Sequence, residues 1–199
     1  MYSDVTGVIL AGGKSSRMGV NKSFLKLGNQ TIIERTVDLM KSIFSNVIII
    51  TNTPNEYQFL NLPLYEDIYK LKGPLAGIHS ALSHSETERI FVLPCDLPFM
   101  SREMIEYILF YPTDKPVVFC HAGGFHQPLV GIYSKCILPY VEDFLSNNNL
   151  IDKSLLSFLK IIDIEVIHPE NLAFYKEELF CNINTKEDYE FIKKRGTYE

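Results

Sequence analysis

The chain has 199 residues and a mass of 22.8 kDa, the size of one domain, so we expect a single domain over residues 1–199. A hydrophobic content of 46% with 22% charged residues excludes a disordered, collagen-like or coiled-coil chain. The net charge of −5 argues against nucleic acid as a partner, and no apolar run approaches the roughly 20 residues of a membrane helix. The first residues resemble no secretory signal, and the four cysteines form no C-x-x-C pair, so we expect a cytoplasmic protein.

Short apolar runs alternate with helical patterns along the chain. Four consecutive β-branched residues, 47–50, are typical of a strand buried on both faces. Thr31 and Glu34 have the spacing of a capping box, which predicts a helix start. The patterns predict, in chain order, strands at 5–10, 47–51, 64–65, 89–93, 117–121, 127–133 and 165–168, and helices at 31–44, 73–84, 101–111, around 139, at 154–160 and at 186–194.

This alternation predicts an α/β fold with a largely parallel sheet and helices on both faces. In such sheets ligands bind at the carboxyl ends of the strands. Three unusual segments, residues 11–22, 67–77 and 94–98, fall at these ends. The sequence therefore predicts that they form one site.

The first segment is a loop rich in glycine and small hydroxyl residues, which allows backbone N–H groups to approach phosphate oxygens. Residues 5–33 contain no acid, whereas the cations are Lys14, Arg17, Lys22 and Lys26. This favours a local anion site over a flexible turn with solvated lysines. The spacing fits neither a Walker A loop nor a Rossmann fingerprint.

The second and third segments offer a carboxylate and a helix start. Asp96 directly follows a predicted buried strand between two prolines, and its hard carboxylate suits Mg²⁺ bridging to phosphate; the alternative is a turn or capping aspartate. We expect Cys95 to pack as a small apolar residue. Pro74 at a helix start leaves backbone donors facing outward, where a ligand can accept from them. The alternative is that Pro74 only makes a favourable helix start. Asn52 can read a base edge or make an Asx turn.

Neither a histidine metal site nor a hydrolase site is predicted. The five histidines, His79, His84, His121, His126 and His168, lack metal-like spacing, and we expect each to be structural or on the surface. The sequence contains no Ser-His-Asp ordering and no G-x-S-x-G elbow.

The ordered segments closely resemble the molybdenum cofactor guanylyltransferase family over nearly the whole chain. The motifs that carry the resemblance are Leu10-Ala-Gly-Gly-Lys-Ser-Ser-Arg-Met-Gly-x-x-Lys22, Asp67, Gly73-Pro-Leu-Ala-Gly-Ile78, Pro94-Cys-Asp-Leu-Pro98, Gln127-Pro-Leu129 and Asn182-Ile-Asn-Thr185. The resemblance implies a Rossmann-like three-layer sandwich of the nucleotidyltransferase type. It also implies transfer of GMP from GTP to molybdenum-bearing molybdopterin, with release of pyrophosphate.

This reaction gives the segments distinct roles. The resemblance implies that guanine and ribose are surrounded by Leu10, Ala11, Gly12, Asn52, Asp67 and Gly77. The residue chemistry lets Gly12, Gly13 and Ser15 cradle phosphates, with charge balanced by Lys14, Arg17 and Lys22. Asp96 is expected to hold Mg²⁺, with Mn²⁺ as the alternative, and the catalytic set is Arg17, Lys22 and Asp96. Because the acceptor is already an ionised phosphate, no strong general base is required.

We expect a separate molybdopterin pocket with Gln127, Asn182 and Asn184, because amides offer both the donors and the acceptors that a pterin edge needs. The alternative is that these amides only satisfy turns and helix caps. The chain departs from the family at Lys186, where proline is common, and residues 121–126 are idiosyncratic. Other molybdenum cofactor proteins and recipient molybdoenzymes are further expected partners, and the chain is expected to be a monomer or weak oligomer.

Three rival functions stay open at this point. A molybdenum cofactor cytidylyltransferase usually reads Leu-Ala-Ala-Gly in the loop and lacks the Gly-Pro-Leu-Ala-Gly-Ile segment. Another small nucleotidyltransferase is the second rival, although the sugar-phosphate enzymes typically need a longer chain. A nucleotide-binding regulator without turnover is the third, and the combination of Asp96, Arg17 and Lys22 argues against it.

Overall fold

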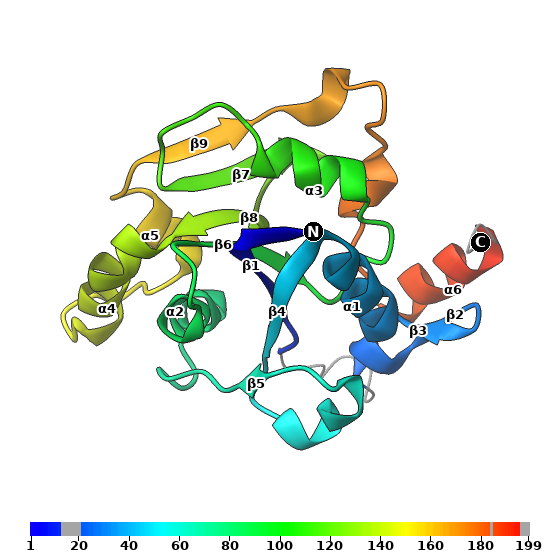
Figure 1. The fold of residues 1–199 in the computed structure, drawn as a ribbon, viewed down its shortest axis with the longest axis horizontal. Helices are drawn as coiled ribbons and strands as arrows, with labels where there is room; N and C mark the ends of the chain where they lie inside the picture. Colours follow the sequence, from blue (N-terminus) through cyan, green and yellow to red (C-terminus); the bar gives the residue numbers. More distant parts are fainter. Residues whose placement is uncertain (13–20, 184, 196–199) are drawn as a thin grey trace.

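The computed structural model describes residues 1–12, 21–183 and 185–195. A seven-stranded sheet in the order β5-β4-β1-β6-β8-β7-β9 forms its centre (Figure 1). The strands are β1 (Tyr2–Leu10), β4 (Phe44–Ile50), β5 (Leu64–Tyr65), β6 (Arg89–Pro94), β7 (Val117–Ala122), β8 (Phe125–Ser134) and β9 (Ile164–Ile167). Within this sheet β8 runs antiparallel to its neighbours β6 and β7, and the other pairs are parallel.

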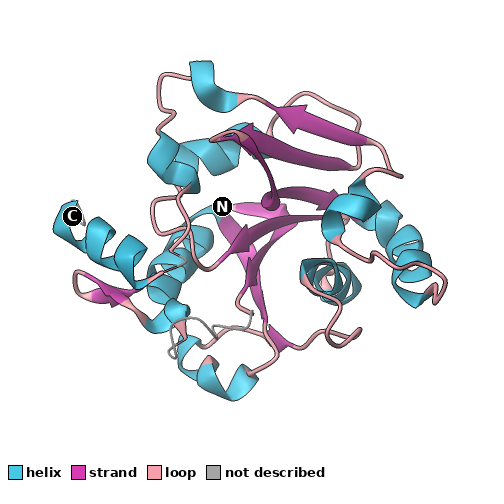
Figure 2. Ribbon diagram, turned by 180° about the vertical axis from the view of Figure 1, so that it is seen from behind, coloured by secondary structure: helices cyan, strands magenta, loops and turns pink. Residues whose placement is uncertain are grey.

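Helices cover both faces of this sheet, so the predicted three-layer α/β fold is confirmed (Figure 2). Alternate residues of β1 point to opposite faces, with Ile9 in one core and Val8 in the other. The core that contains Ile9 packs against α1 (Ile32–Ile43) and α3 (Arg102–Leu109), and the core that contains Val8 packs against α2 (Pro74–His84), α4 (Leu138–Ser146) and α5 (Leu155–Leu159).

Local sequence signals explain several boundaries. Thr31 caps α1 through the predicted capping box with Glu34, and Ser101 caps α3. The predicted strand at 47–51 starts earlier, at Phe44, because α1 ends at Ile43 and the chain enters β4 without a loop. The helix predicted to reach residue 111 ends at Leu109.

A small third core attaches the C-terminal segment to the N-terminal half. The strands β2 (Lys26–Leu27) and β3 (Gln30–Thr31) form a hairpin beside α6 (Lys186–Arg195), as Figure 1 shows. Leu27, Ile32, Ile183 and Ile192 pack together there. The remaining elements are short 3₁₀ turns at Lys22–Phe24, Pro54–Glu56, Gln58–Leu60, Lys135–Ile137, Pro169–Asn171 and Glu177–Phe180.

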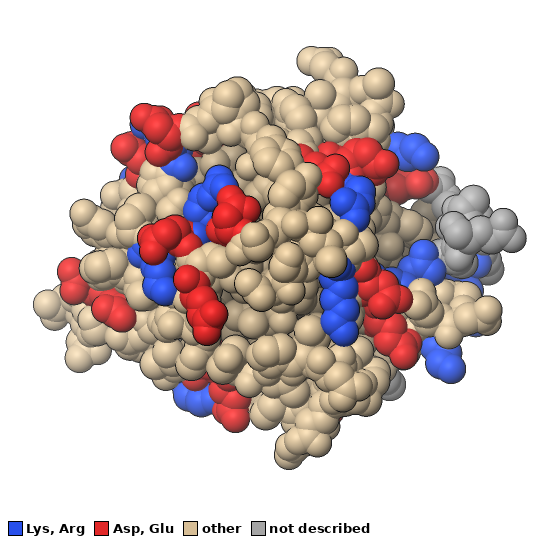
Figure 3. Space-filling model, viewed as in Figure 1, with Lys and Arg blue, Asp and Glu red and all other residues tan. Residues whose placement is uncertain are grey.

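Charges of both signs are interspersed on the face drawn in Figure 3. Among the described residues, no helix combines the length and the apolar character that crossing a bilayer requires.

Candidate functional site

Four parallel strands end side by side and bring the described parts of the three predicted segments together. Leu10 at the end of β1 lies opposite both Ile50 of β4 and Pro94 of β6. Backbone hydrogen bonds continue past the strand ends: Ala11 donates to the Ile50 carbonyl at 2.9 Å and Cys95 donates to the Leu10 carbonyl at 3.2 Å. The predicted segments therefore share one edge, as expected for carboxyl ends of parallel strands.

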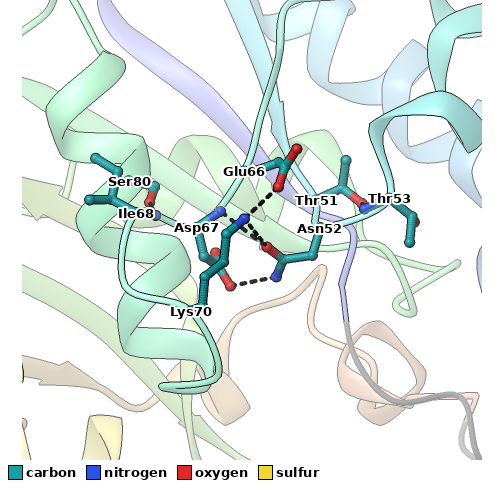
Figure 4. A network of polar contacts seen from close by, with 8 residues as sticks. All are labelled: Thr51, Asn52, Thr53, Glu66, Asp67, Ile68, Lys70 and Ser80. Carbon is teal, nitrogen blue, oxygen red and sulfur yellow. Dashed lines mark hydrogen bonds and ion pairs between the residues drawn. The ribbon is translucent and has the colours of Figure 1, made fainter.

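Asn52 and Asp67 pair reciprocally at this edge (Figure 4). The Asn52 amide Nδ2 donates to the Asp67 carboxylate at 2.6 Å, and the Asp67 backbone N–H donates to Asn52 Oδ1 at 3.3 Å. Lys70 donates to the same Asn52 oxygen at 3.2 Å and forms an ion pair with Glu66. The turn after β4 is made by Thr51, whose hydroxyl accepts from the Thr53 N–H, so Asn52 is held toward Asp67.

Helix α2 supports this pair from behind. The buried Ser80 hydroxyl accepts a hydrogen bond of 2.8 Å from the Ile68 N–H, which fixes the turn directly after Asp67. A Cβ at Gly77 would lie 3.2 Å from Leu10 Cδ2 and 3.6 Å from the Asp67 carboxylate. Glycine therefore allows the helix to approach β1 and Asp67 closely. At the helix start, Gly73 has φ +70° and Pro74 is the first helical residue, as predicted.

Asp96 lies two residues beyond the end of β6 and is half-buried. Burial raises the pKa of its carboxyl group, while its own backbone N–H and the Lys22 ammonium group lower it; the net shift is upward. Lys22 is the first residue of a 3₁₀ turn, and its charge acts on the Asp96 carboxyl group. The structure therefore brings these two predicted catalytic residues close together. The Asp96 carbonyl accepts a 3.1 Å hydrogen bond from the Ile183 N–H, which attaches the C-terminal segment to this edge.

A short polar chain, absent from the sequence-based prediction, holds the turn of Lys22 against Asp96. Tyr57 donates to the Ser23 hydroxyl at 3.2 Å, and the Ser23 hydroxyl lies 3.1 Å from the Cys95 sulfur. Asn21 donates to the Tyr57 oxygen at 3.0 Å and caps the 3₁₀ turn. These residues are up to 74 positions apart in the sequence, and the buried Tyr57 and the Ser23 hydroxyl connect them in the fold, so no local motif signals the network.

Cys95 has the packing role that we expected. Burial raises the pKa of its thiol to about 12, and the nearby Asp96 carboxylate adds to that shift. A thiol with such a pKa is protonated at neutral pH and is a poor nucleophile.

Several predicted residues lie outside the described part of the chain. They are Gly13, Lys14, Ser15, Arg17 and Asn184. Their assigned roles stay predictions.

Gln127 and Asn182 line a common cavity of about 760 Å³. Gln127 lies in β8, where its side chain also donates to the Ala122 carbonyl at 3.3 Å. Asn182 is exposed and lies beside Ile183, in the segment that leads to α6. The other lining residues are aromatic, aliphatic, acidic or small: Phe99, Gly123, Phe125, His126, Glu177, Glu178, Phe180, Cys181, Asp188, Phe191 and Ile192.

Lys186 in place of the family's proline leaves α6 with a well-defined start. The Thr185 N–H donates to the Asp188 carboxylate at 2.8 Å, and the Asp188 N–H donates to the Thr185 hydroxyl at 3.1 Å. This capping box replaces what a proline would contribute.

The sequence predicts no histidine metal site from spacing, yet three of the histidines lie together in the structure. His121 and His126 are opposite residues of β7 and β8, and His168 follows β9 next to them. Sequence spacing missed this group because it forms across three strands. The other two match the structural interpretation: His79 is buried with Nε2 3.3 Å from Glu142, and His84 stacks on Tyr65.

Comparison with known proteins identifies the family. A MobA-like NTP transferase domain matches residues 7–162. The chain is 42% identical to a probable molybdenum cofactor guanylyltransferase of Carboxydothermus hydrogenoformans, over 96% of each chain. It is 34% identical to a molybdenum cofactor guanylyltransferase of Desulfosudis oleivorans, over 94% of this chain and 93% of that protein. The chain belongs to the molybdenum cofactor guanylyltransferase family and is a nucleotidyltransferase.

Solved structures support the fold assignment. An Aquifex aeolicus protein is 32% identical and superposes with a TM-score of 0.77, over 92% of this chain and 96% of that one. The molybdopterin-guanine dinucleotide biosynthesis protein A of Archaeoglobus fulgidus is 20% identical with a TM-score of 0.81, over 96% and 98% of the two chains. The expected family and Rossmann-like nucleotidyltransferase fold are thus confirmed.

Proposed function

We propose that the edge formed by Leu10, Asn52, Asp67, Gly77 and Asp96 carries out the family's reaction, in which GMP passes from GTP to molybdopterin and pyrophosphate is released. The observation that supports this most directly is the reciprocal Asn52–Asp67 pair beside Gly77. It forms a fixed set of donors and acceptors at the strand ends, where a parallel sheet binds nucleotides.

The base and ribose lie against this pair and the β1 end. Asn52 and Asp67 hold one another, so the second amide hydrogen of Asn52 and the remaining lone pairs of the Asp67 carboxylate are oriented before any ligand arrives. Pre-oriented polar groups select a base because a wrong base leaves some of them without partners. The small residues Ala11 and Gly12 let the nucleotide approach the backbone at the end of β1. In the part of the chain that the structure describes, no atom lies within 4 Å of a Cβ added to Gly12.

The phosphates then extend toward Lys22 and Asp96. Lys22 neutralises charge on the triphosphate and on the departing pyrophosphate. Gly13, Lys14, Ser15 and Arg17 are assigned to the same task from their place in the sequence alone.

Asp96 suits a divalent cation. Mg²⁺ is typically held by one or two carboxylates together with substrate phosphates, and a half-buried carboxylate whose charge is disfavoured by burial gains from such a cation. When bound, Mg²⁺, or Mn²⁺ in its place, supplies positive charge at the α-phosphate. The Ser23–Cys95 contact and the Ile183 hydrogen bond hold the backbone on which Asp96 lies, and the Asp96 backbone N–H donates to its own carboxylate.

The cavity beside Gln127 and Asn182 receives molybdopterin. Amide side chains present both donors and acceptors to a pterin edge, and the surrounding phenylalanines pack on its planar ring. Ile183 joins this cavity to Asp96, since its N–H binds the Asp96 carbonyl while its side chain is buried under α6. The acceptor phosphate is therefore delivered next to the proposed metal site, and it attacks without a general base.

The chain works in this proposal as a monomer or weak oligomer in the cytoplasm. Its product passes to recipient molybdoenzymes or to other molybdenum cofactor proteins.

One assay tests the assignment. The protein is incubated with Mg²⁺, molybdopterin and GTP, CTP or ATP in turn, and pyrophosphate and the dinucleotide product are measured. We expect product with GTP and at least about 100-fold less with CTP or ATP, because a mismatched base edge leaves the polar groups of the site without partners. Equal turnover of CTP would support a cytidylyltransferase instead. GTP binding without pyrophosphate release would indicate a nucleotide-binding regulator.

A further inference from the structure

Three histidines and one glutamate lie close together at the β9 edge of the sheet, opposite the β5 edge. The register pairs His121 of β7 with His126 of β8, and it pairs Cys120 with Ile167 of β9. His168 directly follows Ile167, so it takes the place beside His121. Glu170 follows two residues later in the 3₁₀ turn Pro169–Asn171.

The side chains converge as this register requires. The ring of His121 lies 5.2 Å from that of His168 and 5.2 Å from that of His126, measured between centroids. One ring nitrogen of His121, one of His168 and one carboxylate oxygen of Glu170 all lie within 4.8 Å of one another. Among the described residues, the buried Nδ1 of His121 has no hydrogen-bond partner.

We propose that His121, His168 and Glu170 form a binding site for a divalent transition-metal ion such as Zn²⁺, separate from the cation proposed at Asp96. Imidazole nitrogen is a preferred ligand of zinc, copper and nickel, whereas Mg²⁺ selects oxygen ligands. Two imidazoles and one carboxylate with an open fourth position are a common zinc ligand set.

The distances suit closure around an ion. Ligand atoms at about 2.0–2.2 Å from a tetrahedral zinc lie roughly 3.4 Å apart, so the present separation requires only small side-chain rotations. His168 and Glu170 are exposed and their side chains can make these rotations, while His121 is fixed between Phe119–His126 on one side and β9 on the other. The bound ion would hold the end of β7 to the turn after β9.

This site adjoins the acceptor cavity. The ring of His126 contacts His121, and His126 and Gln127 both line the cavity. A metal at His121 would therefore steady the β7–β8 hairpin that presents Gln127. This consequence depends on the proposed function, whereas metal binding itself does not.

Metal titration of the full-length, untagged and chelator-stripped protein tests the proposal. Co²⁺ is the spectroscopic probe, and calorimetry with Zn²⁺ gives the affinity. We expect one equivalent to bind with micromolar or tighter affinity in millimolar Mg²⁺, with visible Co²⁺ bands and no thiolate-to-cobalt band. The absent band separates this site from the exposed thiols of Cys136 and Cys181.

Variants assign the ligands. His168→Ala and Glu170→Gln alter exposed side chains, so both should fold with an unchanged Tm without metal and weaken Zn²⁺ binding at least 10-fold; His121→Ala should abolish it. His84→Ala, an exposed histidine that stacks on Tyr65, is the matched control and should bind as the parent does. Binding that survives in His168→Ala and Glu170→Gln, or that is weaker than millimolar in the parent, would overturn the site. Loss of GMP transfer with intact Zn²⁺ binding would instead concern the proposed function.

Discussion

The nucleotide side and the acceptor side of this sheet edge are constructed in different ways. On the nucleotide side, Asn52, Asp67 and Asp96 follow parallel strands, and hydrogen bonds fix them to one another or to the adjoining backbone. On the acceptor side, Gln127 comes from an antiparallel hairpin and Asn182 from the segment before α6, and they line a cavity of about 760 Å³. The nucleotide side is held by polar pairs between neighbouring strand ends. The acceptor side depends on how the β7–β8 hairpin and the segment before α6 pack together.

This difference separates the expected effects of mutation. Changes on the nucleotide side should affect turnover or the affinity for GTP, whereas changes on the acceptor side should affect only the KM for molybdopterin. Ile183 connects the two sides through its bond to the Asp96 carbonyl.

The strongest test of the nucleotide side is Asp96→Asn. We expect turnover to fall about 10²–10³-fold, as for the loss of one transition-state stabiliser, because the amide keeps the shape but loses the charge that the cation needs. The Tm should not fall, since burial disfavours the carboxylate. Asp163→Asn, an exposed residue before β9 at the opposite edge, serves as the control and should retain full turnover. Near-normal turnover of Asp96→Asn in Mg²⁺ would remove Asp96 from the metal site.

Gly77→Ala tests whether the close approach of α2 matters for GTP. The new Cβ would press on Leu10 Cδ2 and contact the Asp67 carboxylate, and overpacking of roughly 1–2 kcal/mol corresponds to an increase of about 10-fold in the KM for GTP. The higher helix propensity of alanine, about 1 kcal/mol, should keep the Tm close to that of the parent. Ser83→Ala, at the other end of the same helix, should leave the KM unchanged. An unaltered KM in Gly77→Ala would mean that the nucleotide does not use this side of Asp67.

Asn182→Ala tests the acceptor side and should have a smaller effect. Loss of one hydrogen bond, worth roughly 0.5–1.5 kcal/mol, predicts an increase of about 3–10-fold in the KM for molybdopterin with an unchanged affinity for Mg-GTP. Asn149→Ala, a change to an exposed turn residue, is the control. A lower Tm together with weaker use of both substrates would show that Asn182 is structural.

The fold was largely predictable because its signals are local. The capping box at Thr31, the β-branched run in β4 and Pro74 at the start of α2 each specify a boundary within a few residues. The short 3₁₀ turns at 54–60 were missed, because each turn has only three residues and is too short to show an apolar period.

The site was predictable to the extent that parallel strands determine it. Asp96 and Asp67 follow strands, and topology brings strand ends together. The Tyr57–Ser23–Cys95 chain and the histidine group were not predictable, since each depends on registers between distant segments. The acceptor cavity lies between these cases: its amides were named from sequence, but its aromatic and acidic lining comes from tertiary docking.

The smallest expected effect is a pH dependence of stability that opposes the usual behaviour of carboxylates. Burial raises the folded-state pKa of Asp96 above its ordinary value, so the native state binds more protons than the unfolded state between the two values, and stability falls as pH rises through that interval. Asp96→Asn lacks this loss, so its Tm advantage over the parent should grow from pH 4 to pH 7. Asp152 is the matched opposite: hydrogen bonds from Ser157 and Ser154 lower its pKa, so the disadvantage of Asp152→Asn should shrink as pH falls. For each variant, the difference in Tm from the parent is measured by thermal denaturation in the presence of a chelator. Plotted against pH, the two differences should slope in opposite directions. Parallel curves would mean that Asp96 is not desolvated in the native state. The buried carboxylate charge that favours a cation there would then be absent.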